Sequence, residues 1–108
     1  MINIDIFTNN GYINGFELSG HAGYSEYGKD VVCAAVSVLT INTINSIENF
    51  TDDIYDCFED EQIGNISFKI MEEVSNESNL LLQSMVLGLE SIREEYGSDY
   101  ITLVIKEV

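Results

Sequence analysis

Two residues in this sequence could perform nucleophilic chemistry together: Cys33 and His21, the single histidine. Asp30 precedes a long apolar segment and is predicted to be a helix N-cap, which would place Cys33 in the first helical turn. Unpaired N–H groups and the positive end of the helix dipole favour a thiolate there. His21 lies where a predicted strand ends and a loop leads back to that helix. An imidazole so placed could take the thiol proton and later protonate a leaving amine.

A non-catalytic interpretation stays open on these residues alone. Cys33 would then be a small core residue and His21 a polar loop residue. Ser37, four residues after Cys33, shares its helix face, so its hydroxyl could bond near the thiol or imidazole, or could bond its own helix backbone. Cys57 lies among acidic residues that raise a thiol pKa, so we predict a packing role for it.

The loop before the helix approaches a phosphate-binding pattern without completing it. Gly23, Gly28 and Lys29 have the required spacing, but Asp30 follows the lysine where such loops need Ser or Thr to bind magnesium. Acidic side chains there would also repel nucleotide phosphates. We therefore predict no nucleotide binding.

The same loop carries two tyrosines between its glycines. Tyr24 and Tyr27, flanked by Gly23 and Gly28, could form a mobile lid that grips a peptide. An ordinary ordered loop explains the pattern equally well.

No metal or other cofactor is expected. One histidine and two scattered cysteines do not form a zinc set, which needs four ligands and usually a close Cys-x-x-Cys pair. Residues 52–61 contain six acids but lack the ligand spacing and central glycine of a calcium loop. We interpret them as a solvated face suited to a basic partner.

Composition sets the class of protein. The chain has 108 residues, 45% of them hydrophobic, with 19 Asp and Glu against 4 Lys and Arg, a net charge of −15. This predicts one folded domain over residues 1–108, without need of a disulfide between its two cysteines. A reducing cytoplasm is the expected location. The charge disfavours nucleic acid and anionic lipid, and the apolar runs are short for a membrane span.

Hydrophobic periodicity predicts an α+β fold in the order ββαββαβ, two helices packed on a mainly antiparallel sheet. The long apolar helix should lie in the centre of the domain, and Gly97 should end the other helix. Asn9, Asn10 and Gly11 form the first predicted turn, and Gly15 marks a candidate bulge. Strands are expected at 2–8, 12–19, within 52–61, at 63–71 and at 100–108, and helices at 31–49 and 75–96.

The chain resembles the ribosomal-processing cysteine proteases, the Prp family, over residues 20–22 (GHA), 28–37 (GKDVVCAAVS) and 87–96 (LGLESIREEY). The resemblance implies an endopeptidase that removes the N-terminal extension of a bacterial large-subunit ribosomal protein, number twenty-seven, a basic substrate. It implies a homodimer. It further implies Cys33 as nucleophile and His21 as general base, with supporting positions at Gly20, Gly28, Asp30 and Ser37.

A competing function is a non-catalytic acidic binding module, an assembly factor that holds a basic ribosomal protein. It explains the net charge equally well. It does not explain why the histidine, the cysteine near a helix start and the glycine-flanked loop occur together.

Overall fold

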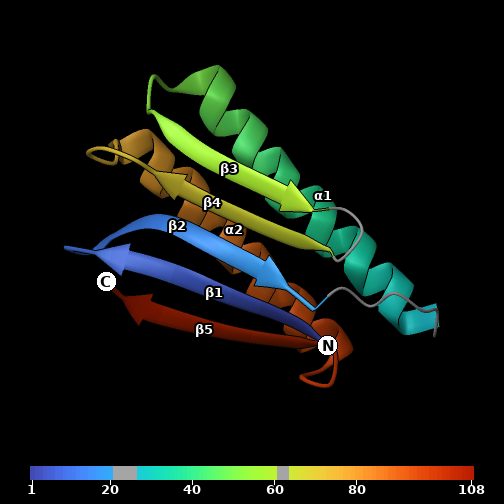
Figure 1. The fold of residues 1–108 in the computed structure, drawn as a ribbon. Coiled ribbons are helices and arrows are strands. Elements are labelled where there is room, and N and C mark those ends of the chain that lie inside the picture. Colours follow the sequence, from blue (N-terminus) through green and yellow to red (C-terminus); the bar gives the residue numbers. More distant parts are fainter. Residues whose placement is uncertain (21–26, 61–63) are drawn as a thin grey trace.

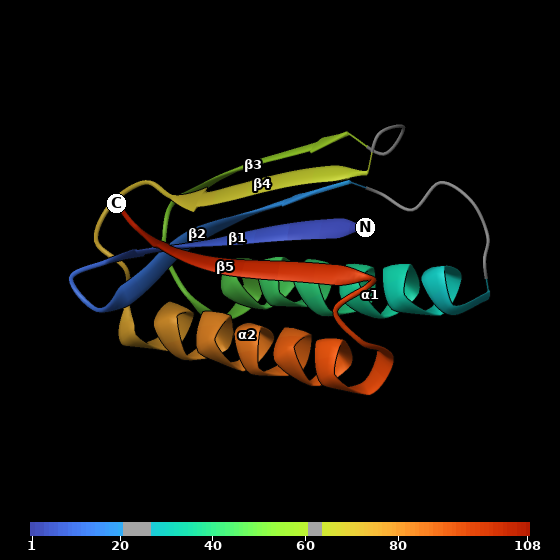
Figure 2. The same ribbon diagram turned by 90° about the horizontal axis from the view of Figure 1, so that it is seen from below.

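Two helices lie on one face of a five-stranded sheet in the computed structural model, which describes residues 1–20, 27–60 and 64–108 (Figures 1 and 2). The order ββαββαβ and the two-layer packing confirm the predicted fold class. The elements are β1 (Ile2–Asn9), β2 (Tyr12–Ser19), α1 (Tyr27–Phe50), β3 (Tyr55–Asp60), β4 (Asn65–Ile70), α2 (Asn76–Tyr96) and β5 (Ile101–Glu107).

The sheet has the strand order β3-β4-β2-β1-β5. The pairs β1–β2, β2–β4 and β3–β4 are antiparallel, and β1–β5 is parallel, so the sheet is mixed but mainly antiparallel, as predicted. Its second face carries no helix within the described residues (Figure 2). This arrangement leaves β3 and β5 as the two edges.

The first hairpin turns at the predicted residues. Asn10 and Gly11 both have positive φ, 52° and 82°, as a tight hairpin turn of the mirror-image type requires. The β1–β2 register shifts between Phe7 and Thr8, opposite the segment that contains Gly15. A side chain on Gly15 would collide with the backbone of Phe68 on β4, so this glycine lets the two strands approach.

The core lies between the sheet and the helices. Ile2, Ile4 and Ile6 alternate along β1 and are buried, as their spacing predicts. Phe16 of β2 stacks on Phe68 of β4 with ring centroids 5.4 Å apart. The helices contribute mainly Val32, Val36, Ile44, Ile47, Leu82, Met85, Val86 and Leu89.

Helix α1 differs from the prediction in start and place. It begins at Tyr27 rather than at Val31, so Asp30 is in its first turn and is not the N-cap. No proline precedes Val31, and a cap contributes only about 1 kcal/mol, so nothing prevents another turn from forming. The expected central position is also wrong, because α1 lies beside α2 and exposes 70% of Val38.

The segment Val31–Phe50 is long and apolar enough to cross a membrane, judged by length and composition alone. The uninterrupted apolar runs within it are short, so they predict no membrane span. In the structure this helix packs against α2, and its Thr40 and Thr43 are buried. Core helices of globular proteins meet the same length and composition criteria. The packing accounts for the buried third of this segment.

The second helix is held at both ends. Ser75 caps α2 by accepting a hydrogen bond from the Ser78 N–H, and Gly97, with φ 97°, ends the helix as predicted. The Asp53 carboxylate accepts hydrogen bonds from the Ser75 N–H and hydroxyl, at 3.0 and 2.7 Å. These bonds fix the start of α2 to the segment between α1 and β3.

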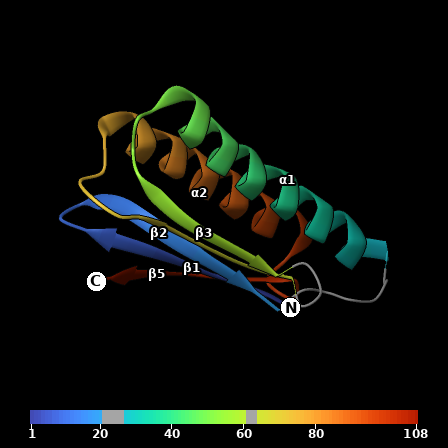
Figure 3. The same ribbon diagram turned by 45° about the horizontal axis from the view of Figure 1, so that its top comes forward.

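The helices also approach closely along their length. Gly88 of α2 packs against the Leu39 side chain of α1, where a Cβ would come within 2.6 Å of it. Figure 3 shows the two helices side by side along the sheet. This packing lets the two helices approach each other closely at Gly88.

Candidate active site

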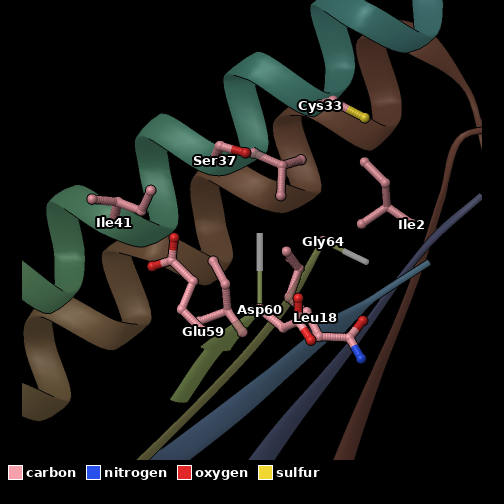
Figure 4. Close-up of a pocket in the computed structure, with 11 residues that line it drawn as sticks. Ile2, Leu18, Cys33, Ser37, Ile41, Glu59, Asp60 and Gly64 are labelled. Carbon is pink, nitrogen blue, oxygen red and sulfur yellow. The ribbon is translucent and has the colours of Figure 1, made fainter. Parts of the chain in front are cut away.

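A cavity of about 150 Å³ lies between α1 and the strands (Figure 4). It is at the end of the sheet where β2 and β3 finish and where β1 and β4 begin. Its lining is mixed, with one thiol, one hydroxyl, two carboxylates, an amide and several apolar side chains. The lining residues are Ile2, Leu18, Cys33, Val36, Ser37, Ile41, Glu59, Asp60, Gly64, Asn65 and Ile66.

Helix α1 supplies one wall of this cavity. Cys33, Ser37 and Ile41 are four residues apart, so they lie on one helix face, and all three line the cavity. Cys33 is half-buried, packs against the core, and has a free thiol. Figure 4 shows this thiol pointing away from the helix, toward the side of the cavity formed by Ile2.

The position of Cys33 along α1 differs from the prediction. Because α1 begins at Tyr27, Cys33 is its seventh residue and lies beyond the first turn. The unpaired N–H groups at a helix start belong to its first four residues. The predicted stabilisation of a Cys33 thiolate by these N–H groups is therefore not supported. What the structure provides for the thiol is a place in the cavity wall, where a bound ligand can reach it.

The Ser37 side chain is half-buried in the cavity. Its backbone carbonyl accepts a hydrogen bond from the Thr40 hydroxyl at 3.2 Å. Within residues 1–20, 31–60 and 64–108, the Ser37 hydroxyl itself has no hydrogen-bond partner. It can therefore donate to a ligand or to a group near Cys33.

Not every predicted site residue can be located. His21 and Tyr24 lie outside the described residues. Tyr27, Gly28 and Asp30 are placed only as backbone in the first turn of α1, so the lid interpretation of the tyrosines stays a prediction. Among the described residues, the structure brings together Cys33 and Ser37.

Gly20 is described, and its role there is conformational. Its φ is 80°, and a Cβ would collide with the Met1 carbonyl oxygen. Such a backbone conformation favours glycine. Gly20 therefore directs the chain out of β2, two residues after Leu18, which lines the cavity.

Two acidic lining residues, Glu59 and Asp60, were missed as site residues because residues 52–61 were interpreted as a solvated face. The short strand predicted there is confirmed as β3. The alternation of residues along this strand could have indicated that Glu59 faces the site, because Tyr55, Cys57 and Glu59 share one side of the strand. The Glu59 carboxylate gives the end of the cavity near Ile41 a negative charge (Figure 4).

Cys57 behaves chemically as predicted but is not a packing residue. Burial raises the pKa of its thiol, and the neighbouring carboxylates of Glu59 and Asp56 raise it further. Its side chain is nevertheless exposed on the edge strand β3. Neither cysteine forms a disulfide, and of the two only Cys33 lines the cavity.

No group of three or more His, Cys, Asp or Glu side chains in the described part of the chain could hold a metal ion. The described lining of the cavity offers a thiol, a hydroxyl, two carboxylates and an amide.

Comparison with known proteins gives consistent matches. The family model described as cysteine protease Prp matches residues 1–102. A ribosomal processing cysteine protease Prp of Staphylococcus aureus is 33% identical over 100 residues, 92% of this chain and 94% of that protein.

Two solved structures of the S. aureus ribosomal processing protease Prp are similar over the whole fold. The first, in complex with a substrate peptide, has a TM-score of 0.90 and 34% identity, covering 98% of this chain and all of the other. The second, with a covalently linked product peptide, has a TM-score of 0.87 with the same identity and coverage.

Proposed function

The chain belongs to the cysteine protease Prp family, and on that premise we propose that it removes the N-terminal extension of a basic ribosomal protein through a Cys33–His21 pair. The observation that carries the proposal is the Cys33 thiol in a cavity large enough for a substrate side chain. Leu18, at the end of β2, lines the same cavity and precedes His21 by only three residues.

The reaction begins with transfer of the Cys33 thiol proton to His21. The thiolate attacks the carbonyl carbon of the scissile peptide bond, and the resulting tetrahedral intermediate collapses as His21 protonates the leaving amine. This step leaves the new N-terminus free and the other fragment bound to Cys33 as a thioester. Water, deprotonated by His21, then attacks the thioester and releases a carboxylic acid and the Cys33 thiol. A related protease holds a covalently linked product peptide, which supports a covalent intermediate.

Ser37 has a positioning role in this proposal. It is one helical turn from Cys33 and lines the cavity with it, so its hydroxyl is placed to hold the substrate or the catalytic groups. We expect Ser37→Ala to lower the cleavage rate less than Cys33→Ala does, because the nucleophile is retained.

The substrate we propose is bacterial large-subunit ribosomal protein number twenty-seven. Its basic character complements a chain with a net charge of −15, because opposite charges accelerate and stabilise encounter. The alternative of a non-catalytic acidic module explains the charge but not membership of a cysteine protease family.

Incubation with the precursor of that ribosomal protein tests the proposal. Intact mass spectrometry should detect one truncation near its N-terminus with the wild-type chain, and none with Cys33→Ala or His21→Ala. An unchanged precursor with the wild-type chain would contradict the proposed substrate. Cleavage at the wild-type rate by either variant would contradict the proposed pair.

We further propose that the enzyme acts in the cytoplasm as a homodimer and does not bind nucleic acid directly. The outer side of the helix layer supports an interface between two copies. An apolar depression there is lined by Ala34, Ala35, Val38, Leu39, Asn42 and Ile92. On α2, Leu80 and Leu87 are also exposed.

A further inference from the structure

Glu59 is an acidic residue on the side of the sheet that faces the helices. Along β3 it alternates with Tyr55 and Cys57, and cross-strand partners project to the same side of a sheet. The β4 partners of these three residues are Ile70, Phe68 and Ile66, all of them buried in the core. Glu59 itself is exposed, so its carboxylate is at the mouth of the cavity rather than inside the core.

The cavity extends along α1 from Cys33 toward Glu59. Figure 4 shows Ile41 and Glu59 at the end of the cavity away from Cys33. Cys33 and Ile41 are eight residues apart on one helix, a rise of about 12 Å. An extended peptide advances about 3.3 Å per residue, so this distance corresponds to three or four residues of bound substrate.

Among the side chains in the described part of the chain, none forms an ion pair with Glu59. Among the side chains that the structure describes, the ion pair is that of Lys106 with Asp5, on β5 and β1. Ile41 and Ile66 provide apolar surface close to this negative end, a combination suited to a long side chain with a cationic head.

We propose that Glu59 is a specificity-determining residue that binds a lysine or arginine of the substrate three or four residues from the cleaved bond. The aliphatic stem of that residue would lie on Ile41, and its charged head would pair with the carboxylate. This inference rests on the proposed function, since it takes Cys33 as the point of cleavage.

A structural role for Glu59 makes a different prediction. Inward-pointing charges on edge strands prevent sheets from pairing edge to edge, and β3 is an edge strand. Loss of such a charge would promote association of the protein, or lower activity equally for all substrates. It would not alter the preference for a basic residue at one position.

A peptide panel separates the two roles. Each peptide contains the processing site of the ribosomal protein, with a single lysine placed two to five residues from the cleaved bond on either side. The enzymes are the wild-type chain, Glu59→Gln and the control Glu17→Gln, which removes the same charge from an exposed residue of β2.

We expect the wild-type chain to prefer a lysine three or four residues from the bond on one side. Glu59→Gln should lower kcat/KM for those peptides by about two- to fivefold, the range typical of an exposed ion pair, and leave the others unchanged. Glu17→Gln should behave as wild type, and 1 M salt should reduce the preference. Glu59→Lys should prefer glutamate at the same position.

An equal loss for every peptide, or an unchanged lysine preference in Glu59→Gln, would refute the assignment of Glu59. Binding of the same labelled peptides to Cys33→Ala and to Cys33→Ala/Glu59→Gln, measured by fluorescence anisotropy, gives a readout that does not need cleavage. Absence of cleavage by the wild-type chain would refute the proposed substrate, and the binding measurement would still decide the role of Glu59.

Discussion

Cys33 of α1 and Leu18 of β2 line the same cavity, although they belong to different layers of the fold. The contact between layers brings the proposed nucleophile to the end of the strand that leads to His21. A lone half-buried cysteine has no evident function, but one that lines a cavity beside this strand end is accessible to a substrate.

The two cysteines should differ completely in their importance for cleavage. Cys33→Ala should lower kcat/KM by at least about a thousandfold, because removal of a nucleophile eliminates the covalent pathway. Cys57→Ala is the matched control, since Cys57 is exposed on β3 and does not line the cavity. It should cleave within about twofold of the wild-type rate. Comparable losses in both variants would contradict the assignment.

Cys57 should be alkylated slowly near neutral pH. Burial and the carboxylates of Glu59 and Asp56 raise the pKa of its thiol, so its thiolate forms only at higher pH than that of a free cysteine. Iodoacetamide labelling between pH 6 and 10, read by mass spectrometry, should give a curve that shifts to lower pH in Glu59→Gln. An unshifted curve in both Glu59→Gln and Asp56→Asn would contradict this electrostatic origin.

Acid should weaken the connection between Asp53 and α2. Burial raises the pKa of Asp53, but hydrogen bonds from Ser78 and Ser75 outweigh this effect, so the pKa is lower than that of an ordinary aspartate. The folded state therefore favours the carboxylate, and this stabilisation is fully present above about pH 4 and is lost as the pH falls further. Urea unfolding of Asp53→Asn should have a shallower dependence on pH below about pH 4 than wild type. The exposed Asp52→Asn should follow the wild-type curve.

Gly20 and Gly11 separate two effects of a glycine-to-alanine change. Both have positive φ, near 80°, but a Cβ on Gly11 meets nothing within 4 Å, whereas one on Gly20 meets the Met1 carbonyl. Gly11→Ala should lower the free energy of unfolding by about 1 kcal/mol through backbone strain alone. Gly20→Ala should lower it more, as measured by thermal unfolding. Equal losses would show that the Met1 contact is unimportant.

The proposed dimer can be tested on the helix layer. Val38, 70% exposed, is in the apolar depression between α1 and α2, and a charge there would have to be buried in an interface. Val38→Glu should convert the dimer into a monomer in sedimentation velocity. Val104→Glu, the same change on β5, should leave the dimer intact. A dimer in both variants would place the interface elsewhere.

Local patterns in the sequence were sufficient to predict most of the fold. The alternation of Ile2, Ile4 and Ile6, the Asn10–Gly11 turn and the Ser75 and Gly97 ends of α2 depend on neighbouring residues only, and the structure confirms them. The start of α1 was predicted less well, because a favourable cap at Asp30 competes with continued helix formation upstream.

Side-chain exposure near the sheet edge was also predicted incompletely. Ile101, Leu103 and Ile105 alternate perfectly along β5, yet Ile101 is buried and Ile105 is 59% exposed. Periodicity identifies the side of a strand on which residues lie. It does not indicate how far the helices cover that side.

The sequence by itself determined the order of the elements, the resemblance to a protease family and the cysteine and histidine proposed for catalysis, because these depend on residue types and short spacings. Only the tertiary structure decided that Cys57 is exposed and that Glu59 shares a cavity with Cys33. These features arise from strand register and from the packing of α1 over the sheet. Both depend on contacts between residues distant in the chain, which local sequence patterns do not encode.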